Sequence, residues 1–286
     1  MPELPEVETV VRDLRPQLEG RRVVRAWAGV PGVLRYPSPG EFARRLEGRT
    51  LARVGRHGKF ILVEVAADAP HPASPRLRGE ELLVLHLGMT GRLGLAEPEA
   101  EVPPHTHLRL LLSSGAELRM QDYRRFGRAM FGTRAELEAA RVLPRLGPEP
   151  YAGALPLREF GRILGRSHRP VKALMLDQSR LAGLGNIYCD EALFRAGIRP
   201  TAIAAGLGPG RRRRLFEGIE AALTAAVDLR GTTIDDYRDG FGNAGNNQHA
   251  LLVYGRAGQP CVRCGGTLAK TVVGGRTTVY CPRCQR

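Results

Sequence analysis

The first residues of the chain, Met-Pro-Glu-Leu-Pro-Glu, place an unusual nucleophile at its start. A proline in second position is small enough for the initiator methionine to be removed, which would turn the Pro2 ring nitrogen into a terminal secondary amine. Terminal amines have a pKa of about 7.7–8.0, so a useful fraction is neutral and nucleophilic near neutral pH. Attack of this amine on an aldehyde-like carbon gives a cationic iminium directly. Glu3 and Glu6 could protonate a leaving group there, although these residue types also begin many ordinary helices.

The last 26 residues contain four of the five cysteines, in two Cys-x2-Cys pairs separated by sixteen residues. Four thiolates at this spacing complete a tetrahedral shell, so we predict one structural Zn²⁺ ion held by Cys261, Cys264, Cys281 and Cys284. Disulfides are the alternative, and they fit poorly with a chain expected in the cytoplasm. The intervening β-branched runs around a Gly-Gly pair predict a hairpin, whose tip would carry Arg276.

The balance of charge narrows the class of partner. The 286 residues include 43 basic and 29 acidic side chains, a net charge of +14, and the pI is about 10.4. Such a pI indicates a nucleic-acid binder, although a basic surface without a partner is the simpler alternative. Only three basic residues are lysines, namely Lys59, Lys172 and Lys270. The sequence has no run of roughly 18 apolar residues, so we predict no membrane span. The acidic start does not resemble a secretory signal, and we therefore expect a cytoplasmic protein without a membrane partner.

The elements that must position these residues follow from periodicity. Residues 5–20 predict an amphipathic helix that ends at Gly20. Strand-like stretches at 22–27, 60–65, 82–87, 107–112 and 117–120 predict a β-rich domain behind that helix. Residues 66–80 are rich in Ala, Pro and Arg, and we interpret them as a surface insertion.

A second, helical region follows the proline-rich stretch 144–156, which we interpret as an interdomain linker. Helical patterns lie around 157–165, 170–178, 187–196 and 208–229, and the Gly- and Asn-rich stretch 231–250 predicts a mobile loop. Between two of these helices, LAGLGN predicts a tight turn at Gly183 and Gly185, with Asn186 capping the next helix. Such a helix start could bind a phosphate, or it could be an ordinary packing corner.

Taken together, the motifs resemble one family closely, the bacterial formamidopyrimidine-DNA glycosylases (Fpg/MutM). The matching motifs occur in the family's order along the whole chain. They are PELPEVE, HGKF at 57–60, HLGMTG at 86–91, DYRRFG at 122–127, LDQSRLAGLGNIYCDEALFRAGIRP and the terminal zinc ribbon.

The resemblance implies an α+β protein of two domains. Residues 1–143 would form a catalytic β-sandwich with a leading helix, joined by the linker 144–156 to a helix–two-turn–helix domain with a lesion-recognition loop at 157–250. A β-hairpin zinc finger at 251–286 would end the chain. Double-stranded DNA with oxidised bases would be the partner, and the damaged nucleotide would be flipped out of the stack, because its glycosidic bond cannot be reached inside a duplex.

The resemblance also assigns chemistry to five residues. Pro2 would attack the sugar C1′ and displace an oxidised purine, with Glu3 as the main acid and Glu6 supporting it. The Schiff base would then undergo β-elimination with Lys59 as proton donor, followed by δ-elimination involving Arg276.

Further residues match the family's DNA contacts. Met89, Arg124 and Phe126 would fill the hole that the flipped base leaves, because apolar, aromatic and guanidinium groups suit an emptied stack. Packing in the protein core is the alternative for Met89 and Phe126. His105, Arg124 and Asn186 match positions that contact DNA.

The chain departs from the family at two places that bear on specificity. Tyr123 stands where the family often has Pro, and residues 238–250 do not keep the expected Gly/Pro pattern of the base-recognition loop. The leading hypothesis is a monomeric, nucleoid-associated glycosylase and AP lyase acting on 8-oxoguanine and formamidopyrimidines. Specificity of the endonuclease VIII type, for oxidised pyrimidines, and a zinc-ribbon DNA-binding protein without catalysis are the alternatives.

Overall fold

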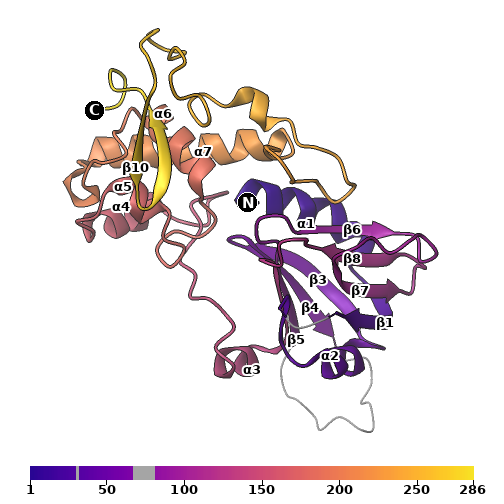
Figure 1. The fold of residues 1–286 in the computed structure, drawn as a ribbon. Coiled ribbons are helices and arrows are strands. Elements are labelled where there is room, and N and C mark those ends of the chain that lie inside the picture. The colour runs from indigo at the N-terminus through magenta and orange to yellow at the C-terminus, as the bar shows by residue number, and fades with distance from the viewer. Residues whose placement is uncertain (30–31, 67–80) are drawn as a thin grey trace. The chain divides into compact units, whose positions relative to one another are not determined.

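The computed structural model describes residues 1–29, 32–66 and 81–286, so all of the expected insertion at 66–80 except Ala66 lies outside the described residues. The chain divides into two compact units (Figure 1). The first unit comprises Met1–Pro2, Glu6–Pro144 and Arg230–Gly245, and the second comprises Glu3–Pro5, Arg145–Leu229 and Asn246–Arg286. Among the described residues, every helix is too short or too polar to span a bilayer.

A nine-stranded sheet forms the first unit, in the order β2-β9-β5-β4-β3-β1-β7-β8-β6. Its strands are β1 (Arg21–Ala28), β2 (Leu34–Tyr36), β3 (Thr50–His57), β4 (Phe60–Ala66), β5 (Glu81–His86), β6 (Arg92–Ala96), β7 (Thr106–Leu112), β8 (Glu117–Gln121) and β9 (Arg128–Thr133). Helices α1 (Leu4–Leu18), α2 (Pro39–Leu46) and α3 (Arg134–Ala139) accompany the sheet.

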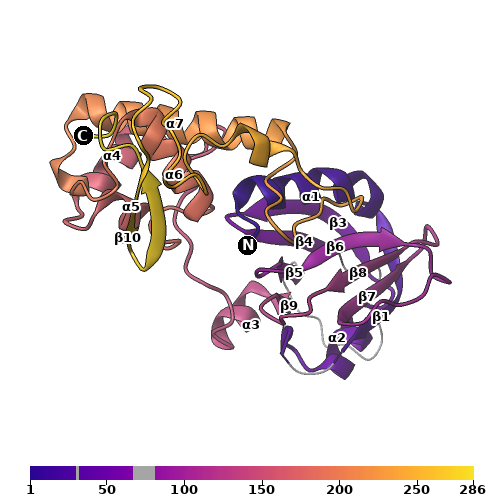
Figure 2. The ribbon, with the colours of Figure 1, turned by 45° about the horizontal axis from the view of Figure 1, so that its top comes forward.

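Strand β1 joins the two halves of this sheet. Its first residues, Arg21 and Arg22, pair with β3, whereas its pairing with β7 runs from Val23 to Ala28. Alternate side chains of both halves face one shared hydrophobic core, which α1 completes along its apolar stripe. Figure 2 shows α1 alongside the strands of this unit. Val7, Val10, Val11, Leu14 and Leu18 form this stripe and are at most 1% exposed. The predicted β domain with a leading helix is therefore confirmed.

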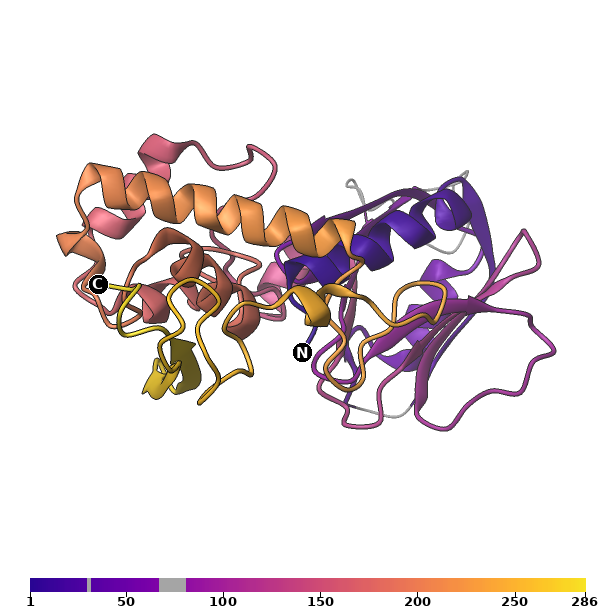
Figure 3. The same cartoon turned by 90° about the horizontal axis from the view of Figure 1, so that it is seen from above.

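The second unit is mainly helical, with α4 (Leu157–Gly165), α5 (Val171–Met175), α6 (Asn186–Ala196), α7 (Pro209–Asp228) and two short 3₁₀ turns, η1 (Ala204–Gly206) and η2 (Asn247–Ala250). The long orange helix in Figure 3 is α7. Strands β10 (Ala269–Val273) and β11 (Arg276–Tyr280) pair as an antiparallel hairpin. Its turn is Gly274-Gly275, both at positive φ, which matches the predicted hairpin and its favoured two-residue turn.

The segment between α7 and η2 is irregular, and side chains of α1 hold its first part. Asp13 forms an ion pair with Arg230 at 2.7 Å, and its carboxylate also accepts a hydrogen bond from the Gly240 amide. Glu6 accepts a hydrogen bond from the Thr232 amide at 2.7 Å. Residues 230–245 thus belong to the compact first unit.

Candidate functional site

Glu3 lies at the start of helix α6, where backbone amides surround its carboxylate. Its two carboxylate oxygens accept hydrogen bonds from Gly185 (2.7 Å), Ile187 (3.0 Å) and Tyr188 (3.4 Å), and the side chain is 3% exposed. A carboxylate is well placed here, because the first amides of a helix lack intrahelical acceptors and the helix dipole is positive at this end. The residue next to Pro2 is therefore fixed by charge complementarity.

This arrangement corrects the expectation for Asn186. We predicted it as the cap of the helix, but the N-cap is Gly185 without a side-chain bond, and Asn186 is the first helical residue. Its amide nitrogen instead donates to the Thr277 carbonyl in the hairpin at 3.0 Å. The amides of Gly185, Ile187 and Tyr188 cannot bind a phosphate as suggested, because they already donate hydrogen bonds to Glu3.

Pro2 is buried, whereas Met1 beside it is 49% exposed. Glu6 is only 1% exposed, and its backbone carbonyl accepts a hydrogen bond from the Tyr237 hydroxyl in addition to the Thr232 bond. Gly231, at φ +84, is needed here, because a Cβ on it would lie 3.0 Å from the Glu6 side chain. Both acidic residues are therefore placed by contacts with distant segments of their own units.

Lys59 lies in the two-residue turn between β3 and β4, where His57 pairs with Phe60. It is 5% exposed. Burial, with the charges of Lys59 and Arg128, lowers the pKa of His86 to about 4. The neutral imidazole accepts a hydrogen bond at Nδ1 from the Gly88 amide at 3.1 Å. The predicted hairpin position of Lys59 thus lies beside an imidazole that stays uncharged near neutral pH.

Met89 and Phe126 are loop residues outside the core, 40% and 50% exposed. Met89 follows β5, and Phe126 lies between β8 and β9, where the Arg124 guanidinium stacks 4.8 Å from its ring centroid. His105 is exposed just before β7 and adopts a positive φ of 64°. Core packing is therefore excluded for both hydrophobic side chains, and the first unit presents apolar and cationic groups together on its loops.

Arg276 is the exposed first residue of β11, directly after the hairpin turn. The strand behind it is held by a buried lysine, because Lys172 Nζ donates to the Thr277 carbonyl (3.1 Å) and to the Thr278 hydroxyl (2.7 Å). The Asn186 amide contacts the same Thr277 carbonyl. Helices α5 and α6 therefore position the hairpin next to Arg276.

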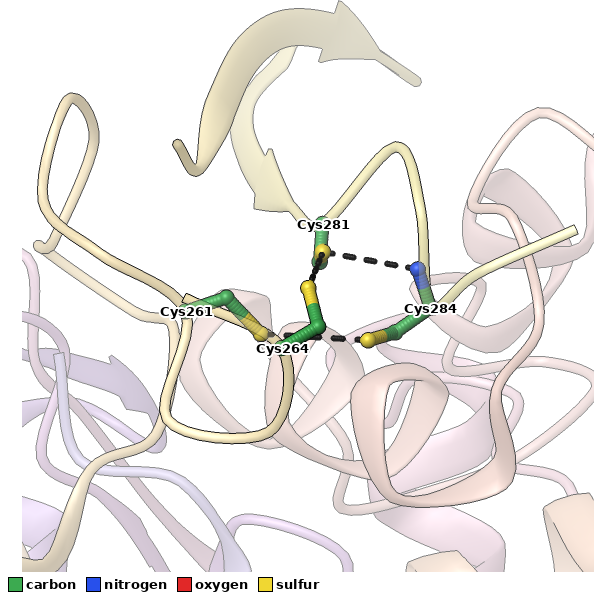
Figure 4. Close-up of side chains that lie close together, drawn as sticks. All are labelled: Cys261, Cys264, Cys281 and Cys284. Carbon is green, nitrogen blue, oxygen red and sulfur yellow. Dashed lines mark hydrogen bonds between the residues drawn. The ribbon is translucent and has the colours of Figure 1, made fainter. Parts of the chain in front are cut away.

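The four cysteines gather beside the hairpin, as Figure 4 shows. Their sulfur atoms all lie within 4.8 Å of one another, with 3.9 Å between Cys261 and Cys284 and 3.6 Å between Cys264 and Cys281. Four thiolates at about 2.3 Å from one tetrahedral zinc ion are separated by about 3.8 Å, so the residues fit the ion. The site is a four-cysteine zinc finger with one structural Zn²⁺, as predicted.

Sequence reasoning missed three buried polar residues near these side chains. Asp122 and Thr90 connect the loops that carry Phe126 and Met89, and Asp190 forms an ion pair with Lys172. The scarcity of lysine singled out Lys172, but no local pattern indicated its partner. Asp122 is the first residue of the DYRRFG motif. Its place between a strand and an Arg-rich turn was the sequence feature that could have indicated a structural role for it.

Three family models match the chain. The model described as "Formamidopyrimidine-DNA glycosylase N-terminal domain" matches residues 1–129, and the "Formamidopyrimidine-DNA glycosylase H2TH domain" matches 146–238. "Zinc finger found in FPG and IleRS" matches 258–286. Together they match most of the chain and parts of both units described above.

Curated relatives match over nearly their whole length. The formamidopyrimidine-DNA glycosylase of Moorella thermoacetica is 45% identical over 270 residues, 94% of each chain. That of Geobacillus kaustophilus is 42% identical over 287 residues and covers all of both chains.

Solved structures give the same result. The crystal structure of MutM (Fpg) from Thermus thermophilus is 41% identical, with a TM-score of 0.83, over 99% of this chain and 98% of its own. Lactococcus lactis Fpg bound to DNA with an N7-benzyl-Fapy-dG is 32% identical, with a TM-score of 0.86 over both whole chains. The same Lactococcus protein has been solved with DNA that contains an abasic site, and this chain resembles that structure at a TM-score of 0.85.

Proposed function

The chain belongs to the formamidopyrimidine-DNA glycosylase family, and we propose how its own residues carry out the reaction. It is a DNA glycosylase with AP lyase activity that removes oxidised purines in base-excision repair. The main observation behind the residue roles proposed below is that three amides at the start of α6 hold the Glu3 carboxylate. These hydrogen bonds fix the position of the residue next to the nucleophile Pro2.

The nucleophile is the Pro2 nitrogen after removal of Met1. It forms a bond to the sugar C1′ while the glycosidic bond breaks, and the bonding electrons leave with the oxidised base. The Glu3 carboxylate accepts the proton that the proline nitrogen loses and passes it to the leaving base or to the sugar ring oxygen, and Glu6 supports it. The ring opens to a cationic Schiff base on the proline nitrogen. The burial of both carboxylates supports these roles, since charges act more strongly where water is excluded.

The strand is then cut in two eliminations. The iminium makes the C2′ hydrogen acidic, and water takes it as a proton. The electron pair left behind forms the C2′–C3′ double bond and expels the 3′ phosphate, which Lys59 protonates. Arg276 assists the second elimination, which releases the 5′ phosphate. Lys59 is buried in its turn and Arg276 is exposed at the hairpin tip, so the first residue is suited to proton transfer and the second to a phosphate.

Double-stranded DNA is the proposed partner, bound by a monomer in the cytoplasm at the nucleoid. Met89, Phe126 and Arg124 fill the space of the extruded nucleotide, while His105 and Asn186 contact the DNA. The exposed loop positions of the first four residues and the net charge of +14 support this proposal. The zinc ion, when bound, holds the β10–β11 hairpin and thereby the Arg276 position.

Borohydride trapping tests the proposal. Reduction during turnover should link the protein covalently to DNA that contains 8-oxoguanine or a formamidopyrimidine, each paired with each opposite base. Pro2→Gly should trap poorly, and a chain with an uncleaved N-terminal extension should bind DNA without trapping. Trapping by the extended chain would reveal another nucleophile, and preferential trapping on oxidised pyrimidines would replace the purine specificity with that of the endonuclease VIII type.

A further inference from the structure

Two loops of the first unit carry the residues proposed to fill the emptied stack. The first, residues 87–91, follows β5 and includes Met89. The second, residues 122–127, connects β8 to β9 and includes Arg124 and Phe126. We call them the Met89 loop and the Phe126 loop. Their tips are exposed, and their bases are buried.

The backbones of the two loops touch. A Cβ atom on Gly88 would lie 2.5 Å from both the Gly127 nitrogen and the Phe126 carbonyl carbon, and Gly88 has a positive φ of 62°. A glycine is therefore required at this crossing, because any side chain would push the loops apart. Because the two loops lie this close together, a buried side chain of one loop can form a direct hydrogen bond with a buried side chain of the other.

Asp122 supplies that bond, and its side chain is 1% exposed. One carboxylate oxygen accepts the Gly127 amide at 2.6 Å, and the other accepts the Arg124 amide at 3.2 Å, so the carboxylate closes the Phe126 loop on itself. The second oxygen also accepts a short hydrogen bond from the Thr90 hydroxyl of the Met89 loop. Bonds to an ionised carboxylate are stronger than neutral ones, so one buried group holds both loops.

The backbone of Asp122 extends this arrangement to the segment with His105. The Asp122 amide donates to the His105 carbonyl at 3.0 Å, and the Asp122 carbonyl lies 2.9 Å from Nε2 of the buried His107. Three segments that carry proposed DNA contacts therefore meet at one residue. Neither Asp122 nor Thr90 reaches the surface, since Thr90 is 3% exposed.

We propose that Asp122 and Thr90 are positioning residues that fix the Met89 and Phe126 loops as a single rigid wedge before DNA arrives. The inference rests on the proposed void-filling role of Met89, Arg124 and Phe126. Loops that are ordered in advance lose less conformational entropy when they enter the stack, so insertion is faster and tighter. The Thr90–Asp122 bond is the side-chain connection that makes the two loops act together.

Hydrogen exchange of the free protein tests the connection without DNA. Thr90→Val keeps the shape of the side chain and removes the hydroxyl, so the Gly127 and Arg124 amides should exchange about tenfold faster, as expected for one lost hydrogen bond. Thr90→Ser restores the donor and should restore slow exchange. Thr133→Val is the matched control, because Thr133 is a similarly buried threonine that caps α3 and should leave these amides unchanged. Unchanged exchange in Thr90→Val would overturn the connection.

Insertion into DNA is measured with 2-aminopurine opposite the lesion, whose fluorescence rises when its stacking partner is lost. Thr90→Val and Asp122→Asn should lower the rate of this fluorescence rise, the insertion phase, about tenfold. Thr90→Ser and Thr133→Val should leave the rate of the insertion phase unchanged. Met89→Ala and Phe126→Ala serve as references. If these two leave the phase unchanged, the void-filling role itself fails, while exchange still decides whether the loops are connected. If they slow it and Thr90→Val does not, the loops are not required to act as one wedge.

Discussion

Lys172 Nζ lies 2.7 Å from Asp190 Oδ1, and neither side chain has any exposed surface. The lysine comes from α5 and the aspartate from α6, and both also bind β11. Asp190 accepts the Val279 amide at 3.0 Å, while Lys172 binds Thr277 and Thr278. A charged pair thus sits beneath the strand that begins at Arg276. Burial raises the pKa of Asp190 to about 6, although Lys172 acts in the opposite direction.

Breaking this pair should be costly. Lys172→Met leaves a buried carboxylate without its cation, so we expect the free energy of unfolding to fall by about 3–5 kcal/mol. Lys172→Met with Asp190→Leu should lose much less, because no charge is left uncompensated. Urea unfolding of the two variants and the parent measures both values. Equal losses in the single and double variants would mean that packing, and not the charge, is responsible.

Glu3 is expected to have two separable roles, one in stabilising the start of α6 and one in proton transfer during base excision. Glu3→Ala removes the group that binds three amides at the start of α6, and loss of such a capping interaction costs about 1–2 kcal/mol. Glu3→Gln keeps an acceptor oxygen and should recover part of that stability, but it cannot transfer the proton needed for base release. Thermal unfolding and single-turnover base excision distinguish the two effects. Excision by Glu3→Gln at the parental rate would remove Glu3 from the proposed chemistry.

His86 should make the protein sensitive to acid. Its pKa is about 4 in the folded chain and 6.5 in the unfolded chain, so between these values only the unfolded state gains the proton. Stability therefore falls as the pH drops from 6.5 to 4, by roughly 3 kcal/mol in total, since one pKa unit corresponds to about 1.4 kcal/mol. Urea unfolding over this range measures the slope. His86→Gln should flatten it, and an NMR titration showing a charged His86 at pH 5.5 would contradict the prediction.

Removing zinc should release the hairpin while sparing the first unit. Four thiolates without their ion repel one another or become protonated, and the small core around the cysteines cannot replace the lost bonds. Chelation should therefore make residues 251–286 sensitive to protease and weaken DNA binding. The measurement is limited proteolysis beside a binding titration at fixed salt. Undiminished DNA binding by a chelated protein whose hairpin is cleaved would exclude the finger from the DNA interface.

Much of the molecule follows from local sequence. The Cys-x2-Cys pairs, the Gly274-Gly275 turn and the amphipathic stripe of α1 depend on residues close together in the chain, so spacing alone predicts the zinc finger, the hairpin and the leading helix. The loop positions of Met89 and Phe126 were also predictable, because glycine and charged neighbours surround them. The helix expected at 5–20 is observed at Leu4–Leu18, a difference of one or two residues.

Only the tertiary structure decided which distant groups are partners. The side chain that binds the free amides at the start of α6 is Glu3, 182 residues before Gly185, and not that of Asn186. The partner of Asp122 is Thr90, and that of Lys172 is Asp190. A buried polar group must be satisfied, but any segment that the fold brings near can do so. Periodicity therefore determines which elements form, whereas the packed chain determines which side chains they hold in place.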